Sequence, residues 1–199
     1  CSFVGSESGS NVGSSGCLAR GGEVVMLDSA KLSRLQFLSR VIIRETDHLL
    51  VTNRRVFNNL MTPERARRLA HDTADSEQVD AFVSRFGRLQ DTLGNRLLPE
   101  LLDALGEPVG AVIDNLDRAE KLKLVSSADH WMSMRRLRNQ MVHEYIEDPA
   151  VLSDALQTGH AFVTNLEEAS VATIRTLAMH EWGDIAVISE FLSDRNPSG

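Results

Sequence analysis

The chain of 199 residues has few cysteines, few prolines, few aromatic residues and no long hydrophobic run. Its two cysteines, Cys1 and Cys17, both lie near the N-terminus, so no disulfide framework is indicated and a reducing compartment is expected. No apolar stretch approaches the roughly 20 residues that a membrane-spanning helix needs. The sequence therefore predicts a soluble, cytoplasmic protein without a membrane partner.

Sequence patterns that bind metals or nucleotides are also missing. The six histidines are scattered, with no pair at i, i+4 spacing and no cysteine partner, so no metal site is predicted. No glycine-rich phosphate loop leads into a helix, and no serine-hydrolase elbow occurs. We therefore expect neither a bound metal nor a cofactor.

What the chain does contain favours helices in one domain. Leu, Ala, Arg and Glu are abundant, whereas there are five prolines and 5% aromatic residues. The hydrophobic fraction of 42% is sufficient for one core. The formal net charge of -7 argues against a broad basic face for nucleic acid. A small basic pocket remains compatible with that charge, because charges act within a Debye length of ~8–10 Å.

The two ends of the chain differ from its middle. Residues 1–27 are rich in serine and glycine and cannot bury apolar surface, so they are expected to be a flexible leader. Two interpretations of the leader stay open: a non-structural upstream extension, or the start of a processed lipoprotein with an acylated Cys1. We expect a helical domain over residues 28–192 and a disordered tail over residues 193–199.

Apolar residues recur at three- and four-residue intervals through the middle of the chain, which predicts amphipathic helices. The predicted helices begin near Asp28, at Thr62, near Glu77 after a polar break at 72–76, at Val109, at Ser126 and at Asp148. Gly94 and Pro99 should bend the third of them. Residues 185–188 could be helix or strand. The expected fold is all-α: an antiparallel four-helix bundle with extra short helices.

A polar segment late in the predicted bundle, Leu137 to Tyr145, carries the main functional signal. Arg138 and Tyr145 are seven residues apart and fall almost on one stripe of a helix. Asn139 and His143 are four residues apart, close enough for their side chains to meet. A cation, a titratable base and a phenol on one helix edge suit chemistry on a phosphate.

The pattern Arg138-Asn139-x-x-x-His143-x-Tyr145 resembles the signature of the HEPN superfamily. The added tyrosine is similar to the HepT branch, the toxin halves of bacterial HEPN/MNT toxin–antitoxin pairs. Segments 85–91, 115–122 and 127–131 also resemble HepT-like proteins, and the whole resemblance covers about residues 28–180.

The resemblance implies a HEPN-like bundle that forms a homodimer, with the two motif helices building one composite cleft. It also implies a metal-independent RNA endonuclease. His143, with an ordinary pKa of about 6.5, would take the proton of the 2′-hydroxyl as general base. Arg138 would stabilise the phosphorane, and Asn139 would orient the imidazole. The products would carry 2′,3′-cyclic phosphate and 5′-hydroxyl ends. Tyr145 would accept AMP from an MNT-type nucleotidyltransferase antitoxin, which would block the RNA cleft.

Other interpretations of these residues stay open. Arg135 and Arg136 could contact RNA or could be solvated helix residues, and Asn139 could be a plain surface amide. Trp131 is expected to pack in the core, and the arginines at 65, 67 and 68 are expected to form a charged face. The alternative functions are a non-catalytic HEPN module that binds a nucleotidyltransferase, and a helical interaction domain tethered through Cys1. The RNA target is not encoded in the motif.

Overall fold

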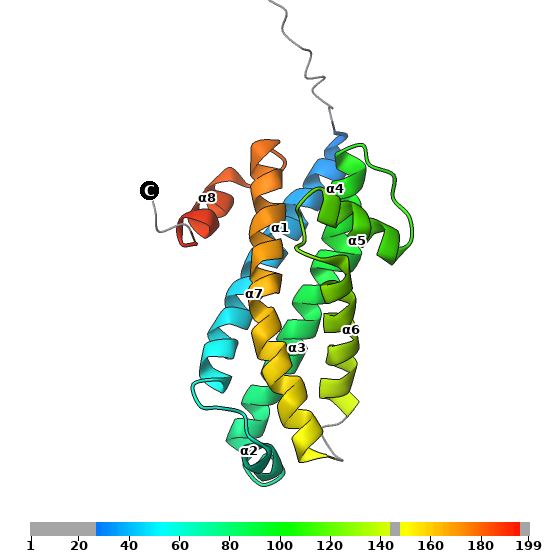
Figure 1. Cartoon of the computed structure of the whole chain (residues 1–199). Helices are drawn as coiled ribbons and strands as arrows, with labels where there is room; N and C mark the ends of the chain where they lie inside the picture. The colour runs from blue at the N-terminus through cyan, green and yellow to red at the C-terminus, as the bar shows by residue number, and fades with distance from the viewer. Residues whose placement is uncertain (1–26, 144–147, 196–199) are drawn as a thin grey trace, which may run out of the picture.

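The structure is a computed structural model that describes residues 27–143 and 148–195, and every regular element in these ranges is helical (Figure 1). The predicted all-α class is confirmed, and the ambiguous residues 185–188 belong to a helix. Among the described residues, no helix is both long and apolar enough to cross a membrane. The helices are α1 (Ser29–Val56), α2 (Pro63–Arg68), α3 (Thr73–Asp91), the π-helix η1 (Thr92–Leu97), α4 (Leu98–Ala104), α5 (Val112–Lys121), α6 (Ala128–His143), α7 (Pro149–Met179) and α8 (Ile185–Ser193).

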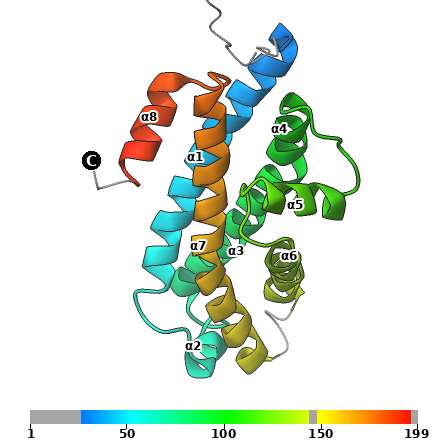
Figure 2. The same cartoon turned by 45° about the horizontal axis from the view of Figure 1, so that its top comes forward.

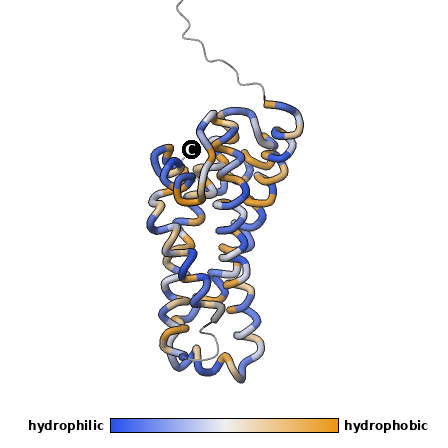
Figure 3. The backbone as a smooth tube through the Cα atoms, turned by 90° about the vertical axis from the view of Figure 1, so that its right-hand side faces the viewer, coloured by the Kyte–Doolittle hydropathy of each residue, from blue (hydrophilic) through white to orange (hydrophobic). Residues whose placement is uncertain are grey.

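Four long helices lie side by side and alternate in direction (Figures 1 and 2). Helix α1 packs against α3 and α7, and α6 packs against the same two helices. Helix α2 lies at one end against α7, whereas α4 and α5 lie at the other end, and α8 packs on α7 and α1. Hydrophobic and hydrophilic stretches alternate along the helices (Figure 3), because each helix turns one stripe toward the shared core.

Short polar side chains start several of the helices at the residues that the sequence indicates. Thr62 Oγ1 accepts from the Arg65 backbone N–H at 3.2 Å, and Asp148 Oδ1 accepts from Ala150 N–H at 2.8 Å. The polar break expected at 72–76 is wrong, because α3 already begins at Thr73. Asp72 is its N-cap and accepts from the Asp75 N–H at 3.1 Å. The residues that resemble a loop by composition are also those that cap a helix.

Where the sequence predicts a bend near Gly94 and Pro99, the structure has the π-helix η1, and α3, η1 and α4 follow one another without an interruption. Gly94 faces the indole of Trp131, and a Cβ at this position would stand 2.9 Å from Trp131 Nε1. Trp131 is 3% exposed, so its predicted packing role is confirmed. Short π-helical segments such as η1 frequently lie next to functional sites.

The arginine cluster at the start of α2 differs from the solvated face that was expected. Arg65 is buried and holds the Asp75 carboxylate through Nε at 2.8 Å and Nη2 at 2.5 Å. Its Nη1 donates to the carbonyls of Val56 and Asn59 at 2.7 and 2.8 Å. Arg65 therefore joins the end of α1 to the start of α3. The neighbouring arginines at 67 and 68 are exposed, as predicted.

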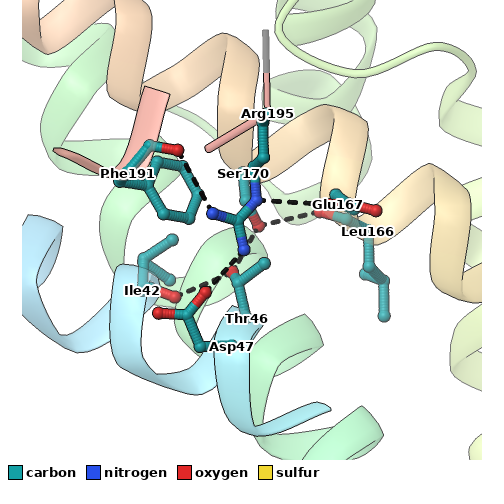
Figure 4. Close-up of polar contacts among 8 residues, drawn as sticks. All are labelled: Ile42, Thr46, Asp47, Leu166, Glu167, Ser170, Phe191 and Arg195. Carbon is teal, nitrogen blue, oxygen red and sulfur yellow. Dashed lines mark hydrogen bonds and ion pairs between the residues drawn. The ribbon is translucent and has the colours of Figure 1, made fainter. Parts of the chain in front are cut away.

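The contacts of Arg195 show that the folded part extends beyond residue 192, where the sequence predicts the helical domain to end. Arg195 lies over the Phe191 ring at 3.9 Å and pairs with Asp47 at 2.5 Å and Glu167 at 3.2 Å (Figure 4). Its side chain is 13% exposed. Because one guanidinium bonds to α1, α7 and α8, the folded part extends to Arg195. Residues 1–26 and 196–199 lie outside the described residues.

Candidate functional site

Helix α6 carries the sequence motif, and its packing decides which motif residues reach a site. Ala128 N–H donates to Glu120 Oε2 at 2.7 Å, and Ser127 Oγ accepts from His130 N–H at 3.3 Å. These contacts fix the first turn of the helix. The buried stripe that follows comprises Trp131, Met134, Leu137 and Met141. Arg138 lies at the edge of this stripe, between the core and the solvent.

The Arg138 side chain lies on the surface of α3. A Cβ at Gly87 would stand 2.5 Å from Arg138 Nε and 3.0 Å from Cδ, so the glycine leaves the space that the arginine stem fills. Nη1 of Arg138 then reaches Asp91 Oδ2 at 3.5 Å. Both side chains of this pair are 42% exposed. Because the ion pair is long and half in water, the guanidinium stays accessible to an incoming anion.

A groove of about 480 Å³ opens beside Arg138. Three arginines line it, together with two carboxylates, an exposed phenylalanine and small or apolar side chains. They come from four elements: Phe37, Leu38, Val41 and Glu45 from α1, Ser84, Arg88 and Asp91 from α3, Thr92 and Arg96 from η1, and Arg138 from α6. The groove is thus the small basic pocket that the acidic net charge left possible.

The two carboxylates of the groove are in different environments. Burial raises the pKa of Glu45, and the Thr92 hydroxyl and the charges of Arg88 and Arg96 act in the opposite direction. Glu45 Oε2 is buried and has no hydrogen-bond partner in the described part of the chain. Asp91 accepts from the Asn95 amide at 3.3 Å and is half exposed. Glu45 is therefore the buried carboxylate of the groove, and Asp91 is the one that water reaches.

The remaining motif residues are not gathered at this groove. Arg135 is partly buried, Arg136 is exposed and donates to Ser133 Oγ at 3.0 Å, and Asn139 is exposed. None of these three lines the groove. His143 is the last residue of α6, but its side chain lies outside the described residues, as does the whole of Tyr145. The shared helix stripe of Arg138 and Tyr145 and the contact of Asn139 with His143 stay predictions.

Sequence reasoning missed the groove partners of Arg138. Arg88 and Arg96 are eight residues apart and share one helix stripe with Thr92, a spacing that was visible in the sequence. Nothing local, however, connects that stripe with Phe37 or with Arg138. Only the packing of α1, α3 and α6 brings them together.

Two further observations bear on the choice of site. A larger cavity of about 740 Å³ lies between the α5–α6 connection, α7 and the end of α8, and no residue of the motif lines it. Within residues 27–143 and 148–195, no cluster of three or more histidine, cysteine, aspartate or glutamate side chains could hold a metal ion. The groove beside Arg138 is therefore the candidate site, because it is lined by a residue of the motif and the larger cavity is not.

In comparisons with protein-family models, with curated proteins and with solved structures, none matches this chain.

Proposed function

We propose that this protein is a HEPN-type, HepT-like RNA endonuclease that acts without a metal, with Arg138 and His143 as its catalytic residues. The observation that carries the proposal is the groove in which Arg138 lies beside two further arginines. Three guanidinium groups against two carboxylates give this groove local positive charge in a chain whose formal net charge is -7. Phosphate oxygens are the ligands that such an arrangement favours.

The accessibility of Arg138 supports its role. Its pair with Asp91 spans 3.5 Å and is half exposed, so a phosphate could replace the carboxylate at little cost. The planar guanidinium can donate two parallel hydrogen bonds to phosphate oxygens and keeps its charge at all relevant pH values. It would stabilise the additional negative charge that develops when a 2′-oxygen attacks phosphorus.

The role of His143 follows from its place in the motif. Five residues after Arg138 and at the end of α6, it would remove the proton from the 2′-hydroxyl of the ribose. The 2′-oxygen then forms a bond to phosphorus and the bond to the 5′-oxygen breaks. The leaving 5′-oxygen takes up a proton, which balances the one removed by His143, so the products are a 2′,3′-cyclic phosphate and a 5′-hydroxyl. Asn139 would hold the imidazole through a hydrogen bond, and Arg135 and Arg136 would contact the RNA further along.

The proposal implies an antiparallel four-helix bundle of the HEPN type, and the alternating arrangement of the long helices supports it. In the proposed homodimer, the α6 helices of two copies meet across a two-fold axis and build one composite cleft. The solvent-facing side of α6, which includes Arg136 and Asn139, is available for such a contact.

The proposed partner is an MNT-type nucleotidyltransferase antitoxin. It would transfer AMP from ATP to the hydroxyl of Tyr145, the one tyrosine of the sequence: the phenol oxygen bonds to the α-phosphorus and pyrophosphate leaves. The added group would place charge and bulk beside the RNA cleft. Incubation with ATP, Mg²⁺ and a cognate nucleotidyltransferase should add AMP-sized mass increments that Tyr145→Phe abolishes. Modification of the Phe variant would disprove this acceptor.

The catalytic proposal is tested with purified protein and RNA in EDTA. We expect cleavage with cyclic phosphate ends, a loss of at least about 100-fold in Arg138→Ala and His143→Ala, and full activity in Arg54→Ala. Arg54 is the matched control, because it is exposed in the last turn of α1 and does not line the groove. Equal activity in all four proteins would mean a contaminating nuclease and would overturn the catalytic assignment.

A further inference from the structure

An exposed aromatic ring lies on the groove that contains Arg138. Phe37 on α1 is 56% exposed, whereas Phe82 and Phe86 of the core are fully buried. The same groove is lined by Phe37, Arg96 and Arg138. An aromatic face and cations that share one groove can bind both parts of a nucleotide, its base and its phosphate.

The register of α1 against η1 and α4 decides where Phe37 lies. Arg34 Nε pairs with Glu100 Oε1 at 2.7 Å, and further along α1 Glu45 lies in the groove together with Thr92 of η1. Because the two helices run in opposite directions, positions between Arg34 and Glu45 face positions between Glu100 and Thr92. Phe37 therefore lies level with the C-terminal end of η1, within one helical turn of Arg96.

Arg96 is the groove cation at that level. It is exposed, and it has no ion-pair partner among the described residues, although its charge acts on Glu45. Arg138 lies at the other end of the groove, over Gly87 and next to Asp91. Eight helical residues separate Phe37 from Glu45, a rise of about 12 Å. Phe37 and Arg96 thus lie together in one part of the groove, and Arg138 lies in another.

We propose that Phe37 and Arg96 form a nucleotide subsite for single-stranded RNA, in which a base stacks on the Phe37 ring and its phosphate lies on Arg96. The inference rests on the proposed function, because that function identifies the bound strand as RNA. The same strand would continue along the groove to the phosphate held by Arg138. Stacking on an aromatic face tolerates any base but needs one that is not stacked within a duplex. The subsite therefore selects unpaired RNA and leaves the choice of base open.

Binding of a short, fluorescently labelled 2′-O-methyl oligonucleotide to the full chain tests the subsite. This probe has no free 2′-hydroxyl, so its binding is measured by anisotropy independently of any cleavage. We expect Phe37→Leu to bind roughly tenfold more weakly, as for the loss of one stacked base, and Phe37→Trp to bind at least as well as wild type. Leu60→Ala is the matched control, since Leu60 is 70% exposed and lies outside the groove.

Two further probes separate the base contact from the phosphate contact. An abasic oligonucleotide should bind equally to wild type and Phe37→Leu, because it offers no base to stack. Arg96→Ala should make oligonucleotide binding less sensitive to salt. The magnitude of the slope of log K, the association constant, against log salt concentration should fall by about 0.7, the value for one phosphate contact on a single strand. A perfect duplex should bind more weakly than the single strand and should be insensitive to Phe37→Leu.

Each remaining outcome decides the inference. If Phe37→Leu binds the single strand as wild type does, the subsite is wrong, whether or not the protein cleaves RNA. If Phe37→Leu weakens binding while the wild type fails to cleave RNA, the subsite stands and the catalytic proposal fails. If Phe37→Leu changes the sedimentation mass but leaves oligonucleotide binding intact, Phe37 belongs to an interface between copies, and the inference is overturned.

Discussion

The stem of Arg138 lies against the backbone of α3 at Gly87, where an added side chain would displace it. A methyl group there would stand 2.5 Å from Arg138 Nε and 3.3 Å from its Cγ. Gly87 is itself buried, although it lies in the interior of a helix where glycine is unfavourable. The position of the guanidinium in the groove thus depends on the absence of a side chain one helix away.

The substitution Gly87→Ala should therefore reduce activity without reducing stability. The arginine stem can move aside, so we expect the free energy of unfolding to stay constant or rise by up to about 1 kcal/mol from improved helix propensity. A displaced guanidinium should lower kcat/KM for RNA cleavage by roughly 10- to 100-fold. Urea unfolding and cleavage assays check the two effects, with Gly110→Ala, outside the groove, as the control. Unchanged cleavage by Gly87→Ala would contradict the dependence on this contact.

Gly94→Ala should lower the stability of the protein, in contrast to Gly87→Ala, because the Trp131 ring that faces Gly94 cannot move aside. The added methyl would stand 2.9 Å from Nε1 of Trp131, a ring that is 3% exposed and packed between helices. Overpacking of this kind costs about 1–3 kcal/mol, which exceeds the gain of about 1 kcal/mol from replacing a helical glycine. We expect a lower melting temperature, partly restored by Trp131→Phe in the same chain. A rise in stability would show that the close approach at Gly94 is not needed.

Glu45 should make the stability of the protein depend on pH. Burial raises the pKa of its carboxyl above the usual value of 4.5, so the folded state holds this proton more tightly than the unfolded state. The stabilising contribution is full below pH 4.5 and is lost as pH rises through the folded-state pKa. At neutral pH the ionised group therefore opposes folding.

The test for Glu45 is the substitution Glu45→Gln, which removes the charge and keeps the size. We expect the variant to be more stable than wild type at pH 7 and the difference to shrink as pH falls toward 4.5, measured by urea unfolding at several pH values. Glu77→Gln, an exposed carboxylate on α3, serves as control and should show no such trend. A difference that does not change with pH would contradict a buried Glu45 carboxyl.

The Arg65–Asp75 pair should behave in the reverse way. The hydrogen bonds from Arg65 lower the pKa of Asp75 below its usual 3.8, so this carboxylate stabilises the fold above that pH, and the contribution is lost as pH falls through the lowered value. Asp75→Asn should cost about 1.5–3 kcal/mol at pH 7, with a narrowing difference from wild type below pH 3.8. Chemical denaturation against Asp80→Asn, exposed on the same helix, provides the comparison. Equal stability of both variants would mean that Arg65 is satisfied by backbone carbonyls alone.

Local patterns in the sequence predict most of the helices of this protein. They fail where one residue type occurs in two structural settings, such as aspartate in loops and at helix caps. Thr62 with Pro63, and Asp148 with Pro149, mark helix starts that the structure has at the same places. Composition predicts a break at Asp72, where the structure has a helix cap, because caps and loops favour the same residues. The helical period predicts a surface position for Arg65, but Arg65 is buried because it bonds to Asp75 and to two backbone carbonyls that the period does not reveal.

Local sequence patterns were enough to predict the helices of residues 27–143 and 148–195, the core position of Trp131 and the polar segment that holds Arg138. These properties follow from the 3.6-residue period and from capping chemistry, which act over a few neighbouring residues. The side chains that share a groove with Arg138 are set by how the helices pack against one another. Gly87, Arg96 and Phe37 reach it from other helices, because a close approach at glycine and the antiparallel register of α1 against α4 place them there, and neither is encoded in the segment that holds Arg138.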